Sequence, residues 1–132
     1  MKVLLSIKPE FVEKIFAGEK LFEYRKVVFK KPGIKFIVIY STMPEGKIVG
    51  EFAIGDILAK HPKDLWEETK QVSGINREFF ENYFCGRDVG YAIQIKALKK
   101  YAQPINPYEI ERNFKAPQSF MYLDCNSNLY SG

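Results

Sequence analysis

The sequence predicts an α+β fold, with a mainly antiparallel, twisted sheet or small barrel and helices at its ends. Short segments of strand character recur along the chain with a few helical segments inserted, and they do not alternate in the βαβ pattern of doubly wound folds. Glycines at positions 50 and 55 interrupt one predicted strand, as glycines often do at barrel corners. A chain of 132 residues is expected to form a single domain, residues 1–132.

The composition indicates a folded, soluble chain, with 46% hydrophobic and 27% charged residues. The net charge of +4 permits binding of a polyanion without establishing it. Cys85 and Cys125 lack a CxxC spacing and have a single histidine to join them, so we expect no metal site and a reducing, cytoplasmic environment. The sequence shows neither a signal peptide nor an apolar run that spans a bilayer, so no membrane association is expected.

The N-terminal region predicts a strand followed by a helix. Lys2–Ile7 is apolar enough for a buried strand, and Pro9 suits the first position of a helix. Apolar residues then follow i, i+3, i+4 spacing until Gly18, which occupies the place of a residue with positive φ after the helix end. Lys8, the expected N-cap residue, has no side-chain acceptor, so either water or an anion is expected at the first N–H groups.

The other elements follow from strand patterns, turn residues and helix caps. A second helix is expected to begin at Pro62, and a third to follow the N-cap residue Asn76 and end at Gly86. Prolines at 104, 107 and 117 are expected to divide the C-terminal region into short pieces. The remaining predicted strands are Lys20–Phe29, Ile34–Tyr40, Ile48–Leu58, Val89–Leu98 and, at an edge of the sheet, Ser119–Leu123.

The segment from Gly18 to Arg25 carries an ammonium, a carboxylate and a guanidinium within a few residues. In a regular strand, Glu23 and Arg25 share one face and Lys20 points to the other. The three charges therefore meet only if Lys20 lies in the turn before the strand or if a bulge intervenes.

Two functions and one structural role fit these charges. A half-buried Lys20 with a lowered pKa acts as a base, whereas a lysine paired with Glu23 stays charged and binds an anion. In the structural alternative, Glu23 and Arg25 form a surface ion pair that contributes little to stability.

Glu51 is a further candidate, because its strand places it between Val49 and Ala53 on an otherwise apolar face. A carboxylate in such a place is either paired or functional. His61 precedes Pro62 at a helix start and is expected on the surface, outside any catalytic relay. The sequence contains no Gly-rich phosphate loop.

The spacing Gly18-x-Lys20-x-x-Glu23-x-Arg25 resembles the signature of the ASCH domain (activating signal cointegrator homology), a branch of the PUA-like β-barrels. The segments LLSIKPE, KIVGEF, FCGRDVGYAI and APQSF, in this order along the chain, resemble a compact stand-alone subgroup labelled as predicted transcriptional regulators. The resemblance implies a barrel of five to six strands with about three flanking helices. It also implies a cleft between barrel and helices, lined by the signature residues.

The same resemblance implies an RNA or nucleotide-like ligand and a regulatory role in transcription or RNA metabolism, with no cofactor. A pocket for such a ligand combines stacking and base-edge hydrogen bonds with basic groups on the phosphates. The expected ligand-binding residues are Lys8, Lys20 and Arg25 for phosphates, Tyr40, Tyr83 or Tyr91 for stacking, and Glu23, Glu51 or Gln118 for the base edge, with Ser41 and Ser119 beside them.

Enzymatic and protein-binding alternatives stay open. A smaller branch of the family resembles an amidohydrolase acting on N4-acetylcytidine, with a lysine at the position of Lys20 and a threonine where this chain has Glu23. Because Glu23 would keep Lys20 charged, the chain favours ligand binding over base catalysis. If it is an enzyme, we expect a metal-independent amidohydrolase or ribonuclease with Lys20 as base and Glu51 as proton carrier. A module that binds a protein partner is the third possibility, and the sequence does not decide the oligomeric state.

Overall fold

A computed structural model describes residues 1–129, which form one six-stranded sheet in the order β2-β5-β4-β3-β1-β6. Neighbouring strands are antiparallel, except for the parallel pair β1 and β3. The predicted α+β fold with a mainly antiparallel sheet is therefore confirmed. The strands are β1 (Lys2–Ile7), β2 (Phe22–Arg25), β3 (Phe36–Ser41), β4 (Lys47–Lys60), β5 (Gly90–Ile105) and β6 (Phe120–Leu123).

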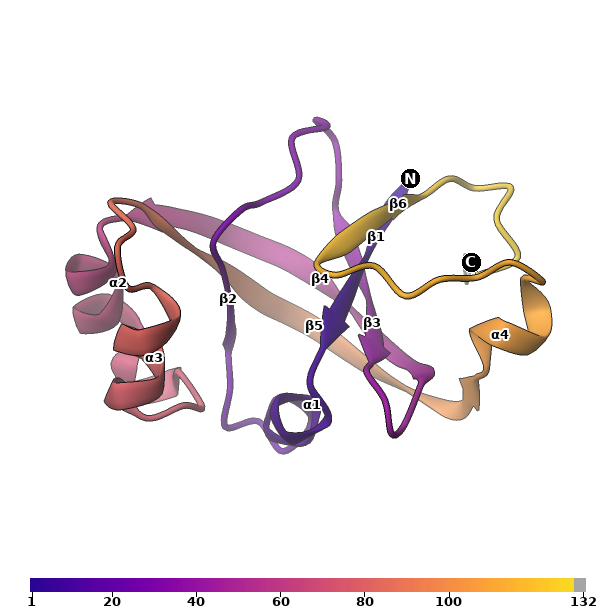
Figure 1. The fold of residues 1–132 in the computed structure, drawn as a ribbon, viewed down its shortest axis with the longest axis horizontal. Helices are drawn as coiled ribbons and strands as arrows, with labels where there is room; N and C mark the ends of the chain where they lie inside the picture. Colours follow the sequence, from indigo (N-terminus) through magenta and orange to yellow (C-terminus); the bar gives the residue numbers. More distant parts are fainter. Residues whose placement is uncertain (130–132) are drawn as a thin grey trace.

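The long antiparallel pair of β4 and β5 runs through the whole molecule, and the sheet curls around it into a half-barrel (Figure 1). The helices α2 (Pro62–Thr69) and α3 (Arg77–Tyr83) lie at one end of this pair, with the 3-10 turn η1 (Lys70–Val72) between them in the sequence. The short helix α4 (Pro107–Ile110) lies at the other end. These three helices are thus at the ends of the sheet, as the sequence predicts, whereas α1 packs on one face of it.

The first helix, α1 (Pro9–Phe16), has the boundaries that its capping residues predict. Lys8 is extended and makes no side-chain cap. At the other end Gly18 has a φ of 77°, a left-handed conformation that suits glycine. Its N–H donates to the Ile15 carbonyl at 3.1 Å, and the Glu19 N–H donates to the Lys14 carbonyl at 3.0 Å. This Schellman motif ends α1 and redirects the chain toward β2.

Several strand boundaries differ from the predicted ones. β2 pairs with β5 over four residues, from Phe22 to Arg25, and not over the whole of residues 20–29. β5 extends to Ile105 and includes Pro104, because register shifts in its pairing with β4 accommodate the irregular segment. The helix α4 was not predicted from the sequence, although Asn106 caps it by accepting a hydrogen bond from the Tyr108 N–H at 3.0 Å.

Alternating residues of β1 place apolar side chains on both faces of the sheet. Val3, Leu5 and Ile7 pack with Val12 and Ile15 of α1, and we call this side the α1 face. The other side, which we call the α4 face because Tyr108 of α4 packs on it, holds the buried side chains of Leu4, Val38, Tyr40, Ile48, Leu123 and Leu129.

A third apolar cluster joins the sheet to the helices at the opposite end from α4. Tyr24 of β2 and Ala92 of β5 pack there against Leu65 of α2 and against Phe80 and Phe84 of α3. Edge-on ring contacts, such as the 5.0 Å between the centroids of Tyr24 and Phe80, fix the helices on the sheet.

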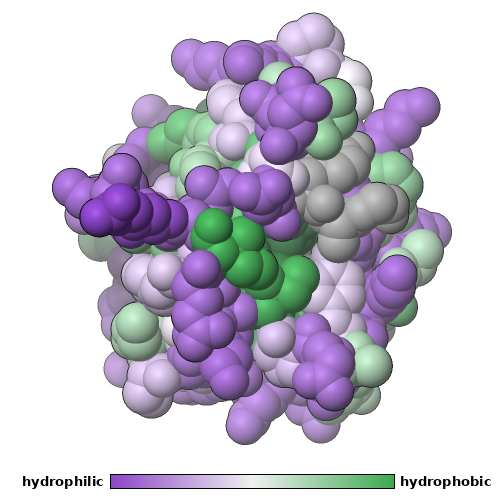
Figure 2. Space-filling view, turned by 90° about the vertical axis from the view of Figure 1, so that its right-hand side faces the viewer, coloured by the Kyte–Doolittle hydropathy of each residue, from purple (hydrophilic) through white to green (hydrophobic). Residues whose placement is uncertain are grey.

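The surface at the α4 end is mainly hydrophilic and surrounds a small hydrophobic area (Figure 2). Within residues 1–129 no helix is long and apolar enough to cross a membrane. Cys85 and Cys125 are free and exposed.

Candidate functional site

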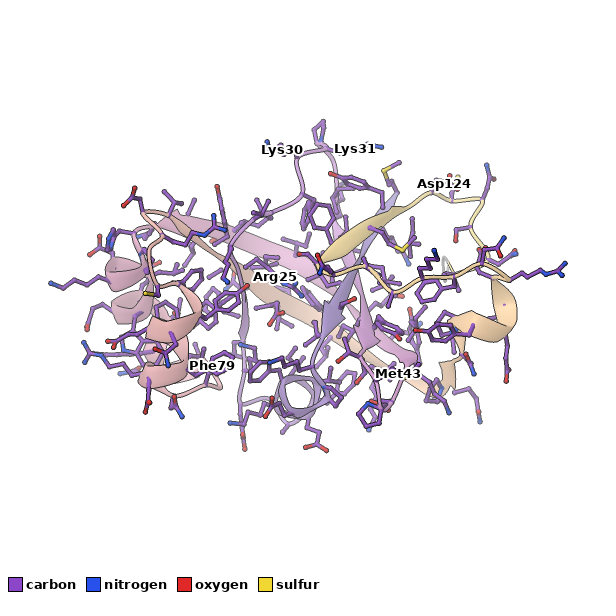
Figure 3. All side chains as sticks on the ribbon, in the orientation of Figure 1. Arg25, Lys30, Lys31, Met43, Phe79 and Asp124 are labelled. Atoms are coloured by element: carbon purple, nitrogen blue, oxygen red, sulfur yellow. The ribbon has the colours of Figure 1, made fainter. Side chains whose placement is uncertain are left out.

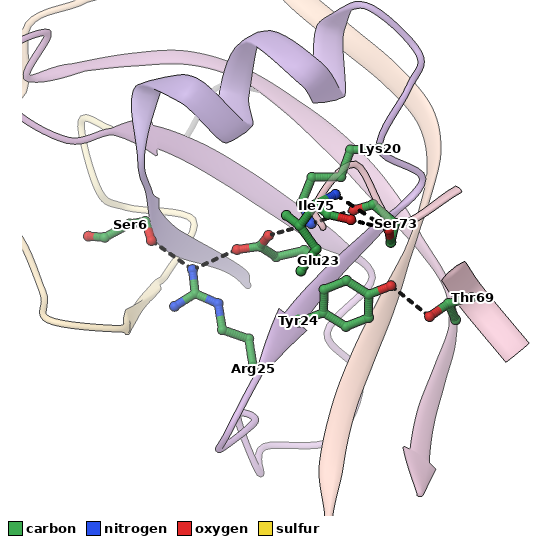
Figure 4. A network of polar contacts seen from close by, with 8 residues as sticks. All are labelled: Ser6, Lys20, Glu23, Tyr24, Arg25, Thr69, Ser73 and Ile75. Atoms are coloured by element: carbon green, nitrogen blue, oxygen red, sulfur yellow. Dashed lines mark hydrogen bonds and ion pairs between the residues drawn. The ribbon is translucent and has the colours of Figure 1, made fainter. Parts of the chain in front are cut away.

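Lys20, Glu23 and Arg25 form one charged network on the α1 face, beside the start of β2 (Figure 4). The Lys20 Nζ lies 3.8 Å from Glu23 Oε1, and the Arg25 Nη2 lies 3.1 Å from Glu23 Oε2. The three charges meet because β2 begins at Phe22, which leaves Lys20 in the preceding turn. The predicted condition for their convergence is therefore fulfilled.

The network is buried, so the alternative of a surface ion pair is wrong. Lys20, Glu23 and Arg25 are 2%, 6% and 8% exposed. The Lys20 ammonium donates a hydrogen bond to the Ser73 carbonyl at 3.0 Å. Burial lowers the pKa of Lys20, and the neighbouring Glu23 carboxylate opposes this shift.

The loop before α3 covers Lys20 closely. Gly74 has a φ of 68°, and a Cβ at this position would lie 2.5 Å from the Lys20 Cβ. Only glycine allows the loop to approach so closely. The Lys20 ammonium also lies 4.6 Å from the ring centroid of Tyr24, whose side chain points to the other face of β2. Lys20 is therefore enclosed by protein groups, and its ammonium contacts Glu23, the Ser73 carbonyl and the Tyr24 ring.

Tyr24 ties this part of β2 to α2. Its hydroxyl group is 2.6 Å from the Thr69 Oγ1, and the Thr69 hydroxyl donates to the Leu65 carbonyl at 2.8 Å. Burial raises the pKa of Tyr24 to about 12. The phenol therefore stays neutral at physiological pH and acts as a fixed structural contact.

Arg25 bridges the open side of the half-barrel. Its Nη2 donates to the Ser6 carbonyl of β1 at 2.7 Å, and its Nη1 donates to the Ser119 Oγ, just before β6, at 3.2 Å. Because β2 lies at one edge of the sheet and β6 at the other, these bonds connect the two sides that the strand pairing leaves apart. Arg25 Nε and Ser41 Oγ are buried and have no hydrogen-bond partner among the described residues.

A strip of aromatic and basic side chains leads from α1 across α3 to the end of β2. Phe79 and Tyr83 of α3 lie parallel, with an interplanar angle of 9° and centroids 6.4 Å apart. Lys8 Nζ lies 5.8 Å from the Phe79 ring, and Lys26 Nζ lies 4.7 Å from the Tyr83 ring. We call these four residues the α3 strip.

The α3 strip and Arg25 are neighbours in one site. Burial raises the pKa of Tyr83, and the nearby Arg25 guanidinium acts in the opposite direction. Phe79 is anchored on α1 by an edge-on contact with Phe11, at 5.2 Å between centroids. In Figure 3, Arg25 is near the centre of the molecule and Phe79 is on α3, toward one end.

Other predicted site residues lie around Arg25. Tyr91 is opposite Arg25 in the pairing of β2 and β5, so both side chains leave the same face of the sheet. Ser41 is opposite Ile7 at the end of β1, close to the carbonyl that accepts from Arg25. Gln118 is exposed and directly precedes Ser119.

Glu51 and Tyr40 are on the α4 face, away from this site. Glu51 is opposite Val38, accepts a hydrogen bond from the Tyr101 hydroxyl at 2.6 Å, and lies 3.4 Å from Lys2 Nζ. Tyr40 is 1% exposed, and its hydroxyl oxygen is 2.6 Å from that of Tyr108. Glu51 therefore does not join Lys20, and the Tyr40 ring is covered by other side chains.

The neighbours predicted for Glu51 are partly wrong. A register shift between Ile48 and Gly50 breaks the alternation of β4, and Val49 packs in the core of the α1 face. Ala53 still shares the side of Glu51, because the pairing of β4 with β3 is regular between them, although the pairing with β5 shifts there.

Two members of the α3 strip, Phe79 and Lys26, were not predicted from the sequence as site residues. The i, i+4 spacing of Phe79 and Tyr83 was a usable signal, since side chains so spaced lie on one face of a helix. Their basic partners come from distant segments, and only the tertiary structure brings them together.

The curled sheet with helices at its ends and a charged network at its open side defines a PUA-like domain. Within this class the chain belongs to the ASCH domain family, whose model matches residues 5–115.

Three similar proteins illustrate the relationship. An ASCH domain-containing ribonuclease from Zymomonas mobilis is 27% identical over 128 residues, which cover 92% of this chain and 84% of that protein. The crystal structure of ASCH from Zymomonas mobilis superimposes with a TM-score of 0.85 at 26% identity, covering 94% of this chain and 88% of that chain. The large ribosomal subunit protein uL22 of Ureaplasma parvum is 24% identical over 92% of this chain, but the match spans 39% of that longer protein.

Proposed function

We propose that this ASCH domain binds single-stranded RNA on the α3 strip, with Arg25 at one end of the binding path. The observation that carries the proposal is the arrangement of the strip, in which exposed lysines flank two parallel aromatic rings. Proteins that bind single strands combine stacking platforms with basic groups along the backbone in this way. The similarity to an ASCH domain-containing ribonuclease supports RNA as the polymer.

Each part of the site has a distinct task in this proposal. Bases stack on Phe79 and Tyr83, while the phosphates contact Lys8 and Lys26. Arg25 and the hydroxyl of Ser119 contact the next phosphate or a base edge. A regulatory role in transcription or RNA metabolism follows if the RNA is bound without turnover.

Lys20 and Glu23 act in the proposal as positioning residues for Arg25. Glu23 contacts both cations, at 3.8 and 3.1 Å, and so fixes the guanidinium from the protein side. The Ser6 carbonyl holds the same guanidinium at 2.7 Å. A planar group held at several points presents a defined geometry to a phosphate.

Fluorescence anisotropy with labelled oligoribonucleotides tests the proposal. We expect salt-sensitive binding of single strands that is stronger than binding of an RNA duplex. Tyr83→Ala is expected to weaken binding about tenfold, within the range of one stacked base. Lys26→Ala is expected to lower the slope of log K against log salt by about 0.7.

Lys30→Ala is the matched control, because Lys30 is an exposed lysine in the loop between β2 and β3, away from α3 (Figure 3). Its affinity is expected to stay within about twofold of the wild type, since a remote charge contributes little. Equal losses for Lys26→Ala and Lys30→Ala, or no binding at low salt, would refute the proposal.

Cleavage of RNA is the second candidate function, favoured by the match to the ribonuclease over most of both chains. In a metal-independent reaction the RNA 2′-OH loses its proton to water and attacks the adjacent phosphorus. The bond to the 5′-oxygen breaks, this oxygen takes a proton from water, and the products are a 2′,3′-cyclic phosphate and a 5′-hydroxyl end. Arg25 would stabilise the charge that develops on the phosphate oxygens.

Gel analysis of RNA incubated with EDTA tests this second function. Cleavage that stops with a 2′-deoxy substrate and falls strongly in Arg25→Lys supports it. RNA that stays intact leaves binding as the function, and cleavage that is unaffected by Arg25→Lys would exclude Arg25 from the reaction.

A further inference from the structure

A surface pocket of about 410 Å³ lies between α2 and α3. It is on a different side of α3 from the α3 strip, because Arg77, Phe80 and Phe84 face the pocket whereas Phe79 and Tyr83 form the strip. Its volume is within the range of small-molecule sites and suits a single nucleotide.

One wall of the pocket is aromatic. Trp66 of α2 is half-buried and lies 4.9 Å from the Phe80 ring, between centroids. Phe80 and Phe84 are almost fully buried, which fixes the wall against the third apolar cluster. A rigid indole at the side of a pocket is a good stacking surface for a planar ring.

The rim of the pocket is basic, with Lys63, Arg77 and Arg87 around it. Its two carboxylates are already paired: Glu81 with Arg77 and Glu67 with Lys70, both at 2.8 Å. The Lys70 ammonium holds the pKa of the Glu67 carboxyl below its usual value. Lys63 and Arg87 form no ion pair among residues 1–129.

We propose that this pocket is a second ligand site, which takes a nucleotide through its base and its phosphate monoester. The base lies against Trp66, and the phosphate contacts Lys63 and Arg87. Two sources have this chemistry, a free nucleoside 5′-monophosphate and the 5′-phosphorylated end of an RNA. The site does not depend on RNA binding at the α3 strip.

Tryptophan fluorescence gives a direct test, because Trp66 is the only tryptophan of the chain. Titration with AMP, UMP, GMP or CMP is expected to quench it in a saturable way, with a Kd below about 1 mM for at least one of them. The corresponding nucleoside, which lacks the phosphate, is expected to bind at least about tenfold more weakly. N-acetyltryptophanamide in the same titrations corrects for absorption by the nucleotide.

Variants separate the pocket from the rest of the surface. Arg87→Glu and Lys63→Glu are expected to reduce the affinity about tenfold or more while the melting temperature stays unchanged, because both side chains are exposed. Lys26→Ala, on the α3 strip, is expected to leave the quenching unchanged. Trp66→Ala removes both the proposed stacking surface and the fluorophore, so its nucleotide affinity is measured by isothermal titration calorimetry. We expect this variant to bind the nucleotide more weakly than the wild type.

The two sources are distinguished by comparing 5′-phosphorylated and 5′-hydroxyl oligoribonucleotides. Quenching by the phosphorylated RNA as well as by the mononucleotide assigns the pocket to RNA ends, and quenching by the mononucleotide alone assigns it to a free ligand. Equal quenching by nucleoside and nucleotide, no saturation, or an unchanged affinity in Arg87→Glu would overturn the proposal. The anisotropy of RNA on the α3 strip is a separate measurement, so either proposal can fail alone.

Discussion

Two buried lysine–glutamate pairs lie on opposite faces of the sheet and differ in what surrounds the carboxylate. On the α1 face, Glu23 is shared by two cations, Lys20 and Arg25. On the α4 face, Glu51 lies 3.4 Å from the Lys2 ammonium and accepts a hydrogen bond from the Tyr101 phenol. The pair of Lys20 and Glu23 is connected through Arg25 to β1 and to the segment before β6. The pair of Lys2 and Glu51 is a contact between β1 and β4, joined by Tyr101 of β5.

The comparison shows that burial and opposite charge do not by themselves identify a site. Both carboxylates are largely buried, with side chains 8% and 12% exposed. The α1-face network is different because its last member, Arg25, reaches groups of two other segments. Substitutions in the two regions are therefore expected to differ in their effects on stability and on RNA binding.

The largest effect is expected from Glu23→Gln. Because Glu23 compensates two buried cations, its neutralisation is expected to lower the free energy of unfolding by about 3–5 kcal/mol. Glu51→Gln is expected to cost about 1–3 kcal/mol, since the amide oxygen still accepts from Tyr101. Urea denaturation at neutral pH measures both values, and an equal loss in the two variants would contradict the comparison.

Alkaline pH is expected to destabilise the protein through Tyr24. Its pKa is about 10 when exposed and about 12 when folded, so the folded state holds the phenolic proton longer than the unfolded state. Stability from this group is fully present below pH 10 and is lost as the pH rises to 12, by about 3 kcal/mol.

Urea denaturation across this pH range measures the loss, and Tyr24→Phe is the variant that removes it. Lys20 acts with the opposite sign, because its pKa is lowered on folding: stability increases as the pH rises from the folded value toward 10.5. A decline of the same slope in Tyr24→Phe and wild type would rule out Tyr24 as the cause.

Arg25→Lys is expected to have a moderate effect on stability and a clear one on RNA. A lysine keeps the charge but cannot contact Glu23, Ser6 and Ser119 together, so we expect a loss of about 1–2 kcal/mol and about tenfold weaker RNA binding. Lys2→Gln on the α4 face is the matched variant, and its RNA affinity is expected to stay within about twofold. Similar affinity losses in both variants would show that the effect on RNA binding is not specific to the network of Arg25 on the α1 face.

The smallest effect is expected from Ser119→Ala. This change removes the acceptor of the 3.2 Å bond from Arg25 Nη1, which is worth about 0.5–1 kcal/mol. Gln118→Ala alters the exposed neighbouring residue and is expected to stay within about 0.5 kcal/mol of the wild type. Thermal denaturation of the two variants side by side makes the comparison, and a larger loss in Gln118→Ala would contradict it.

Local signals allowed much of this fold to be predicted. Gly18 ends α1 with positive φ, and Asn76 caps α3 by accepting from the Phe79 N–H at 2.7 Å. Strand alternation also set the condition for the convergence of Lys20 with Glu23, a strand that begins after Lys20 or a bulge, but not whether the condition is met, because the predicted strand included Lys20.

Features that depend on which residues of neighbouring strands are paired could not be predicted. The place of Glu51 depends on its opposite residue Val38 and on the shift near Gly50, and neither can be read from periodicity. The α3 strip likewise depends on three segments that meet in space, with Lys8 and Lys26 far from α3 in the sequence.

The pairing of β1 with β6 joins the beginning and the end of the domain, since Lys2 is opposite Leu123. During synthesis, β1 emerges before the other strands of this sheet and meets β6 only after all of them have followed. Until then one edge of an apolar strand stays uncovered, which makes the growing chain a substrate for chaperones and for mispairing. Pairing with β6 therefore removes the exposed edge of β1 and leaves the short strand β6 at this side of the sheet.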